Sequence, residues 1–422
     1  MSKYTIYIIW LMLYFTAFEG FGIRSESWGG LGSSFIGWYG ILQLVTLLLA
    51  LIIPLKYNWK IELQKYNVIF NSYKYIAILL IIIIIQSYFE TLLYRDVTLY
   101  NIITNFIKMR YIYYYYIFIV LIGYKNGIKI AINSLLFYSI ISALIALVLI
   151  STGGNDLVTK VSNSSDIGRE FRVIIPTSML IIAGLYFFIT KSLLENKLVY
   201  IFSGILCFIA TVLQMHRTLL ITTALVSVYA ILLNSKMKIL NLLIAFISLA
   251  ILSVIFYLIL GEVGVSSHDF SQNINLSLNE FLTLDGTFGL RVFLVTNGLS
   301  YVIKNYLILG TGLNWEDNFY FEDYFENNFV AGPTYDSGYF SIIIVFGIAG
   351  LLTYAYLFKT IFSSLNISIK SMNVETKITS RALKVILVYI LISAITSDNF
   401  LTYNATFIFT LLVALATFQK LK

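Results

Sequence analysis

Arginines are the residues best suited to chemistry in this sequence, because they are distributed differently from the lysines. If the lysines mark the cytoplasmic side, only Arg381 of the eight arginines lies there. The other seven map to the outer side: Arg24, Arg95, Arg110, Arg169, Arg172, Arg217 and Arg291. A guanidinium group binds phosphate with two parallel hydrogen bonds, whereas a lysine ammonium is a point charge. The outer arginines therefore indicate a phosphate or pyrophosphate ligand. Salt bridges to neighbouring acids, such as Glu170 beside Arg169, are the alternative.

Arg217 is the most informative of these arginines. It follows His216 in a short polar stretch between two apolar segments, with almost no loop between them. A charged group at that depth in a membrane is costly and usually faces a polar cavity or a partner. We therefore select Arg217 as a candidate catalytic residue. His216 is a candidate substrate-binding residue, and a place at the membrane interface is its simpler explanation.

A second arginine opens a predicted helix within the long segment 261–336. Arg291 stands near the start of 290–309, which reads as a helix that Gly310 ends. The Gly-Thr-Gly triplet at 310–312 resembles part of a glycine-rich loop, but a helix cap with a turn explains it better. Segment 261–336 is too short and too apolar for an independent enzyme domain. We predict that it folds as a helical lid over the outer mouth of a helix bundle.

An acid and two glycines form a third group. Asp336 and Ser337 are followed, after nine residues, by the Gly-Ile-Ala-Gly stretch at 347–350. Small residues on a membrane helix allow close helix packing. An acid at the outer end of a span is suited to accept a proton from a sugar hydroxyl. Tyr335 is one of several loop aromatics that would stack on sugar rings or pack the lid.

Metal, cofactor and nucleic-acid chemistry are not expected. Cys207 is the single cysteine and lies inside an apolar stretch, and two histidines are too few for a histidine-based metal site. The glycine-rich nucleotide-binding motifs and the HExxH zinc motif are absent from the sequence. The net charge is +7, and its charges lie in loops between apolar segments. Membrane topology therefore explains this charge better than nucleic-acid binding does.

The composition predicts an all-α, polytopic integral membrane protein, with 1–422 as a single membrane domain. The chain is 59% hydrophobic and 12% charged, with a mean hydropathy of +0.86. Apolar runs of about 18 residues or more read as membrane helices. We predict about twelve spans, at 4–20, 36–54, 75–93, 111–124, 130–150, 173–190, 198–215, 218–234, 239–260, 337–358, 382–397 and 400–418. Tyrosines at 111 and 113–116 suggest a membrane–water interface in the fourth.

The lysines set the predicted orientation. With the N-terminus in the cytoplasm, 17 of the 20 lysines fall in cytoplasmic segments, and only Lys108, Lys160 and Lys304 do not. This distribution follows the positive-inside rule and places both termini in the cytoplasm. Segment 261–336 is then the one large outer loop, between the ninth and tenth spans.

Taken together, these features resemble the O-antigen polymerase and ligase superfamily. The resemblance covers the topology, the arginine opening a span within 214–220, the arginine-led helix that runs to a Gly-x-Gly turn at 291–312, and the polar pair before a Gly-x-x-Gly helix at 336–350. In the ligases the polar pair typically begins with His. Because Asp336 stands there in this sequence, the resemblance favours a Wzy-type polymerase.

The resemblance implies a metal-independent glycosyltransferase of the bacterial cytoplasmic (inner) membrane. It would join undecaprenyl-pyrophosphate-linked oligosaccharides into lipopolysaccharide O-antigen or capsule. Cations would stabilise the charge that develops on the leaving pyrophosphate. Arg217 and Arg291 are the candidates for that role, with support from Arg169 and Arg172, and Asp336 would orient or deprotonate the acceptor. Membrane lipids and the flippase and chain-length regulator of the same pathway are the expected partners.

Two alternatives stay open. An O-antigen ligase would transfer the glycan from the carrier lipid to an acceptor. A lipid-linked oligosaccharide flippase would need charged groups along both halves of its path. The predicted spans are nearly free of charge and their polar groups concentrate on the outer side, which favours chemistry there.

Overall fold

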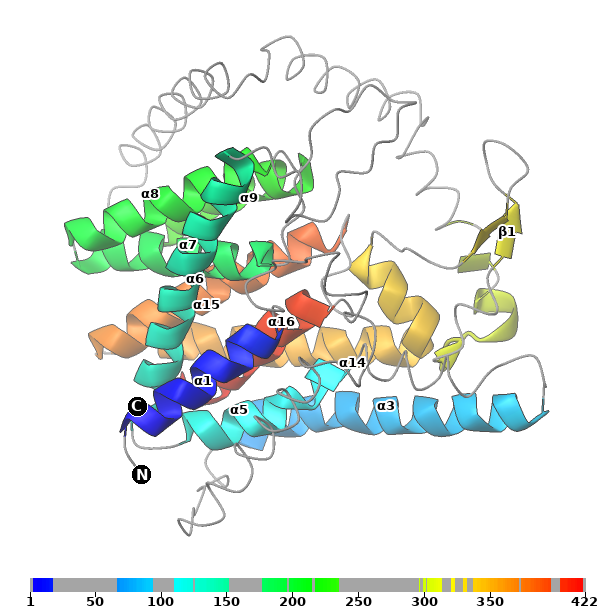
Figure 1. Ribbon diagram of the computed structural model, residues 1–422. Helices are drawn as coiled ribbons and strands as arrows, with labels where there is room; N and C mark the ends of the chain where they lie inside the picture. Colours follow the sequence, from blue (N-terminus) through cyan, green and yellow to red (C-terminus); the bar gives the residue numbers. More distant parts are fainter. Residues whose placement is uncertain are drawn as a thin grey trace.

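A computed structural model describes most of the helical part of the chain. The described residues are 3–17, 67–93, 110–123, 126–151, 177–195, 197–214, 217–234, 296, 299–300, 302–312, 320–322, 329–331, 337–371, 373–395 and 403–419. The helices are α1 (Lys3–Ala17), α3 (Asn67–Leu93), the 3₁₀ helix η3 (Arg110–Ile112), α5 (Tyr114–Ile122), α6 (Gly127–Ser151), α7 (Ser178–Glu195), α8 (Leu198–Leu213), α9 (Arg217–Asn234), α14 (Gly338–Ser368), α15 (Val374–Ser393) and α16 (Tyr403–Thr417). Figure 1 shows them gathered in one bundle.

These helices overlap ten of the twelve predicted spans. The ranges 36–54 and 239–260 lie outside the described residues. Within the described residues, four helices are long and apolar enough to cross a membrane, namely α3, α6, α7 and α14, and shorter apolar helices lie within α1, α8, α9 and α16. The chain is therefore a multi-pass membrane protein.

A small hairpin is the non-helical element of the described part. Strand β1 (Tyr320–Glu322) pairs antiparallel with β2 (Phe329–Ala331), with Phe321 opposite Val330. It lies within segment 261–336, after the helix predicted at 290–309, where no strands were expected from the sequence.

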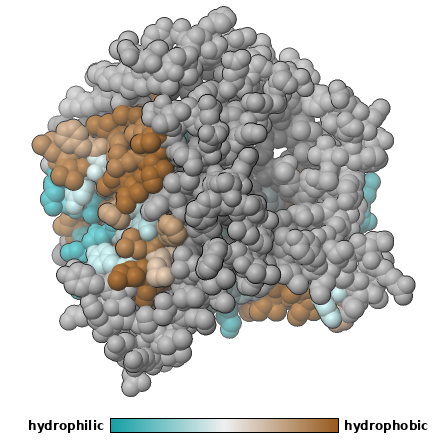
Figure 2. All heavy atoms as spheres, in the orientation of Figure 1, coloured by the Kyte–Doolittle hydropathy of each residue, from teal (hydrophilic) through white to brown (hydrophobic). Residues whose placement is uncertain are grey.

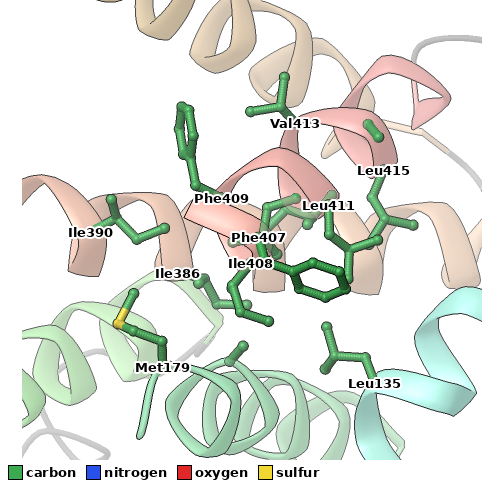
Figure 3. Packing of buried hydrophobic residues seen from close by; sticks show 14 of the residues in the cluster. Leu135, Met179, Ile386, Ile390, Phe407, Ile408, Phe409, Leu411, Val413 and Leu415 are labelled. Carbon is green, nitrogen blue, oxygen red and sulfur yellow. The ribbon is translucent and has the colours of Figure 1, made fainter. Parts of the chain in front are cut away.

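Helix α16 forms the centre of the bundle. Its side chains from 405 to 417 are buried, and it packs against α5, α7, α14 and α15. The ring of Phe407 lies 5.2–6.0 Å from four other rings, those of Tyr14, Tyr111, Tyr114 and Phe118. Figure 3 shows residues of α16 packed with Ile386 and Ile390 of α15, Met179 of α7 and Leu135 of α6.

Three of the five tyrosines of the fourth predicted span are core residues, whose burial among helices the sequence did not predict. Tyr111, Tyr114 and Tyr115 are buried. The Tyr115 ring stacks on Tyr73 with centroids 3.9 Å apart, and its hydroxyl lies 3.0 Å from the hydroxyl of Thr417. Buried tyrosine needs a polar partner for its hydroxyl, and neighbouring helices supply one here.

Small residues bring α6 and α7 close together. The hydroxyl oxygen of Ser139 lies 2.8 Å from the carbonyl oxygens of Leu135, in its own helix, and Leu180, in α7. A Cβ on Gly184 would lie 2.3 Å from the Ser139 Cβ. This contact is of the small-residue kind that holds membrane helices together.

Apolar side chains also cover parts of the outside of the bundle. Figure 2 shows hydrophobic surface over α8 and along α3. Leu198, Val199 and Phe202 of α8 and Ile85 and Phe89 of α3 are exposed. Such faces suit contact with lipid rather than water.

Candidate active site

Helix α14 is broken by a kink at Gly347. This residue has φ 63° and ψ −160°, a backbone conformation that residues with a side chain rarely adopt. Figure 1 shows the part before the kink at an angle to the longer part after it. At such a break, backbone groups near the kink need partners outside their own helix.

The turn at 307–312 supplies those partners. Three backbone hydrogen bonds join the two segments: Ile348 N to Leu307 O at 3.0 Å, Ala349 N to Ile308 O at 3.1 Å, and Thr311 N to Ile344 O at 2.6 Å. The Thr311 hydroxyl donates to the same Ile344 carbonyl at 3.2 Å. We call residues 307–312 together with 344–349 the glycine joint.

Two glycines make this contact possible. Gly310 has φ 72°, and a Cβ there would lie 2.3 Å from the Ile344 carbonyl oxygen. A Cβ on Gly347 would lie 2.3 Å from the Ile308 carbonyl oxygen. The Gly310 N–H donates to Tyr306 O at 2.8 Å, so the turn predicted for 310–312 is present, although it closes residues 306–310 after the helix has ended.

The absence of a side chain at Gly350 also makes the kink possible. A Cβ on Gly350 would lie 2.2 Å from the Cβ of Phe346, which stands just before the break. The sequence predicted that the Gly-x-x-Gly pair allows two helices to pack. Instead, Gly347 packs against a turn of the large loop, and Gly350 makes space for the Phe346 side chain of the same helix.

Helix α3 holds the joint from a second side. The Gln86 side-chain amide donates to the Gly310 carbonyl at 3.3 Å. Gly312 has φ 67°, and a Cβ there would lie 2.5 Å from the Ser87 hydroxyl oxygen. Both polar residues fall within the apolar span Val68–Phe89. Sequence reasoning missed them, although a glutamine after a run of isoleucines is the kind of signal that marks a polar contact inside a membrane bundle.

The helix before the turn is shorter at its end than predicted. Residues 299–300 and 302–305 are helical, and 307–309 form a turn. The predicted helix 290–309 therefore ends several residues early, because the Leu307 and Ile308 carbonyls bond to α14. Val302 packs against Phe340 and Ile344 of α14. The part of the prediction before residue 296 lies outside the described residues.

The start of α14 is fixed to the end of α15. The Gly338 N–H donates to Ala394 O at 2.8 Å, and the Ser337 hydroxyl donates to the same oxygen at 3.3 Å. The Tyr339 hydroxyl donates to Leu391 O at 2.7 Å. These bonds set the position at which the chain enters α14, directly after Asp336.

The start of α9 lies near the same end of α15. Gln214, just before α9, accepts a hydrogen bond from Ser178 at the start of α7. Figure 3 shows Met179, the next residue of α7, beside Ile386 and Ile390 in the last turns of α15. Further along, the Tyr186 ring lies 5.9 Å from the Tyr389 ring, and its hydroxyl donates to Thr223 O at 3.2 Å. Helix α15 packs against both α9 and α14.

Buried polar residues anchor the corner before Arg217. The Ser178 hydroxyl at the start of α7 donates to the Gln214 side-chain oxygen, and the Gln214 amide donates to Ala210 O at 3.0 Å. Gln214 is buried. The backbone of Arg217 begins α9. The corner is therefore fixed to α7 just before the candidate arginine.

The other candidate residues fall outside the described part of the chain. These are Arg169, Arg172, His216, Arg291, Tyr335 and Asp336, and the side chain of Arg217 is likewise not described. Among the described residues, no group of three His, Cys, Asp or Glu side chains has the arrangement of a metal site.

Comparison with known proteins identifies a family for the region that holds these elements. Residues 202–355 match the family described as O-Antigen ligase. No curated protein matches the chain. The matched region contains most of α8, all of α9, the turn at 307–312 and the kink in α14, and members of that family are glycosyltransferase-like enzymes. The match supports, over residues 202–355, the resemblance to the O-antigen polymerase and ligase superfamily seen in the sequence.

Proposed function

We propose that the protein is a polymerase that joins undecaprenyl-pyrophosphate-linked oligosaccharide repeat units into O-antigen or capsule at the outer leaflet of the bacterial cytoplasmic membrane. One observation carries the proposal. The start of α9, at Arg217, and the start of α14, directly after Asp336, flank the same end of α15. Two motifs more than a hundred residues apart therefore open onto one end of the bundle.

In the proposed reaction, a hydroxyl of the acceptor repeat unit attacks the anomeric carbon of the donor glycan. The new glycosidic bond forms as the bond from that carbon to the pyrophosphate oxygen breaks, and the electron pair leaves with the lipid pyrophosphate. Asp336 takes the proton from the acceptor hydroxyl or orients it. Arg217 and Arg291 stabilise the charge that develops on the leaving group, with Arg169 and Arg172 in support. His216 and Tyr335 contact the substrate.

Arginine makes a metal ion unnecessary in this scheme, because fixed guanidinium groups neutralise the pyrophosphate. The cytoplasmic location of both termini follows from the lysine distribution. The flippase that delivers lipid-linked units and the regulator of chain length are the partners that such a reaction requires.

The arginine roles are tested by substitution at Arg217 and Arg291. Removing a cation from a water-excluded site costs about 2.7–4 kcal/mol, or about a hundred- to thousandfold in rate. A bidentate site predicts that Arg217→Lys also loses most polymer, although the charge is kept. Glycan chain length and the amount of protein in the membrane are measured together. Normal polymer from Arg217→Ala and Arg291→Ala, or a loss explained by missing protein, contradicts these roles.

A ligase remains the second candidate, because the matched family bears that description. Deleting the gene separates the two activities. A polymerase predicts that single repeat units still reach the surface while long chains are lost. If finished polymer instead accumulates on the carrier lipid, the protein is a ligase.

A further inference from the structure

The segment that leads into the glycine joint has two different faces. Val302 is buried and Tyr306 is partly buried, and both pack against the first part of α14. Ile303, Leu307 and Ile308 are 56%, 41% and 70% exposed. Ile303 lies in the helical residues 302–305, and Leu307 and Ile308 follow in the turn. A large apolar surface therefore faces away from the bundle.

The contacts of this segment place it beside the membrane spans. Gly310 accepts a hydrogen bond from Gln86 of α3, and α3 continues seven residues beyond Gln86 to Leu93. At 1.5 Å per residue, the turn lies about 10 Å before the end of that helix. Its bonds to Ile348 and Ala349 fall inside a second apolar span, Gly338–Ser368.

The exposed face continues the outer surfaces of these two spans. Ile348 donates its N–H to Leu307 O, and its side chain is exposed, as is that of Leu352 one turn later. On α3, Ile85 and Phe89 are exposed on either side of Gln86. These spans meet lipid if the protein crosses a membrane, so a surface continuous with them meets lipid as well.

Non-helical backbone is tolerated at membrane depth only where its polar groups have partners and protein or water surrounds it. The joint supplies partners to several backbone groups of the turn and covers its backbone with α3 and α14, so that apolar side chains form its outward face. The carbonyls of Leu307 and Ile308 accept from α14, the carbonyl of Gly310 accepts from Gln86, and the Thr311 N–H donates to α14. Lys304 is exposed beside the apolar face, where its long side chain can extend toward lipid headgroups.

We propose that residues 303–308 are a re-entrant membrane contact, in which Ile303, Leu307 and Ile308 touch the hydrocarbon chains of bilayer lipids. This part of the large loop is then inserted into the bilayer, rather than lying above the bundle as the sequence predicted. This inference does not rest on the proposed reaction.

Spin labels measure the contact in the full chain in lipid vesicles. Replacing the single cysteine by Cys207→Ala gives a background for Ile308→Cys and Leu307→Cys. The control variants are Leu352→Cys, on the exposed face of α14, and Lys197→Cys, at the exposed turn between α7 and α8. Collisions of each label with oxygen, which enters hydrocarbon, are compared with collisions with a water-soluble nickel chelate.

We expect labels at 307 and 308 to match the label at 352, with frequent oxygen collisions and few nickel collisions. A pattern like that at 197 would show contact with water and overturn the proposal. Labels that are immobilised and shielded from both agents would show that protein covers this face, and would overturn it as well. Unchanged heat resistance of each labelled variant verifies that the fold is intact.

Discussion

The centre of the bundle and the glycine joint are held together in different ways. In the centre, Phe407 alone contacts four aromatic rings, and its neighbours in α16 are buried among helices that include α5, α7, α14 and α15. In the joint, the contacts are mainly backbone hydrogen bonds, and they depend on the missing side chains of Gly310 and Gly347. The centre of the bundle is stabilised by extensive apolar contact. The glycine joint is stabilised by a few backbone hydrogen bonds, at a distance too short for a methyl group on either glycine.

Because of this difference, the stability of the bundle and the position of the large loop should respond to different substitutions. A packed core tolerates an apolar replacement of similar volume, because neighbouring side chains adjust. A backbone contact at a positive φ tolerates no side chain, because the backbone atoms opposite cannot move aside. Changes in the centre should therefore alter how firmly the whole bundle folds, and changes in the joint should alter where the large loop sits.

Phe407→Ala should give the largest loss of stability. Truncation of a fully buried phenylalanine costs about 3–5 kcal/mol, because apolar contact is lost and a cavity remains. The buried thiol of Cys207 provides the measurement, since a thiol-reactive dye labels it only when the bundle opens on heating. Phe407→Leu is the control and should lower the midpoint much less. Equal midpoints for the Ala variant and the unaltered protein would refute the central role of this ring.

Gly310→Ala should open the joint and leave the bundle folded. Alanine at φ 72° is strained by about 1–2 kcal/mol, and its Cβ would lie 2.3 Å from a backbone oxygen. Hydrogen exchange at 307–312 should become about tenfold faster or more. Gly204→Ala in α8 is the control, since a Cβ there would lie 3.5 Å from its nearest neighbour, an ordinary contact. Unchanged exchange in Gly310→Ala would mean that the joint does not hold the turn.

Gln86→Leu should weaken the joint by a smaller amount. It removes one hydrogen bond of 3.3 Å to the Gly310 carbonyl, worth about 0.5–1.5 kcal/mol. Exchange at 307–312 should rise by less than in Gly310→Ala, with the bundle midpoint unchanged. Ile85→Leu, at the exposed neighbouring position, is the matched control. A larger effect from Ile85→Leu than from Gln86→Leu would count against the contact with α3.

Glu195→Gln should have no measurable effect on stability. Glu195 lies 3.2 Å from Lys197 and raises the pKa of that lysine by a hydrogen bond and by its charge. Lys197 is exposed and Glu195 is partly exposed, so solvent screens the pair. Because the lysine pKa is raised, any contribution is present at neutral pH and is lost only as the pH rises through that pKa. Equal melting midpoints at pH 7 for the variant and the unaltered protein are expected, and a clear drop would contradict this.

Hydropathy located the helices well and their ends less well. The prediction for 198–215 agrees with α8, Leu198–Leu213, but 337–358 stops ten residues before the end of α14. Lys359 ends the apolar window without ending the helix. Helix α15 starts eight residues before its predicted span, because charged residues mask an N-terminus that the Asn373 side chain caps through the N–H groups of Glu375 and Thr376.

The sequence allowed us to predict which motifs form the candidate site. It did not allow us to predict how these motifs contact one another. Spacing identified the Gly-x-Gly and Gly-x-x-Gly groups, and the family match covers both. That the first docks on the second depends on a positive φ at Gly347 and on free backbone groups, and residue types alone do not reveal these. The contribution of Gln86 comes from a helix more than two hundred residues earlier in the chain.

The most direct test measures the surface glycan made by Gly347→Ala. A Cβ at this position would lie 2.3 Å from the Ile308 carbonyl oxygen, so the large loop should leave α14 while Cys207 stays protected in the bundle. Chain length is compared with that of Gly204→Ala at equal amounts of folded protein. If the joint positions the loop for the reaction, Gly347→Ala gives single repeat units and Gly204→Ala gives long chains. Long chains from both variants would contradict this.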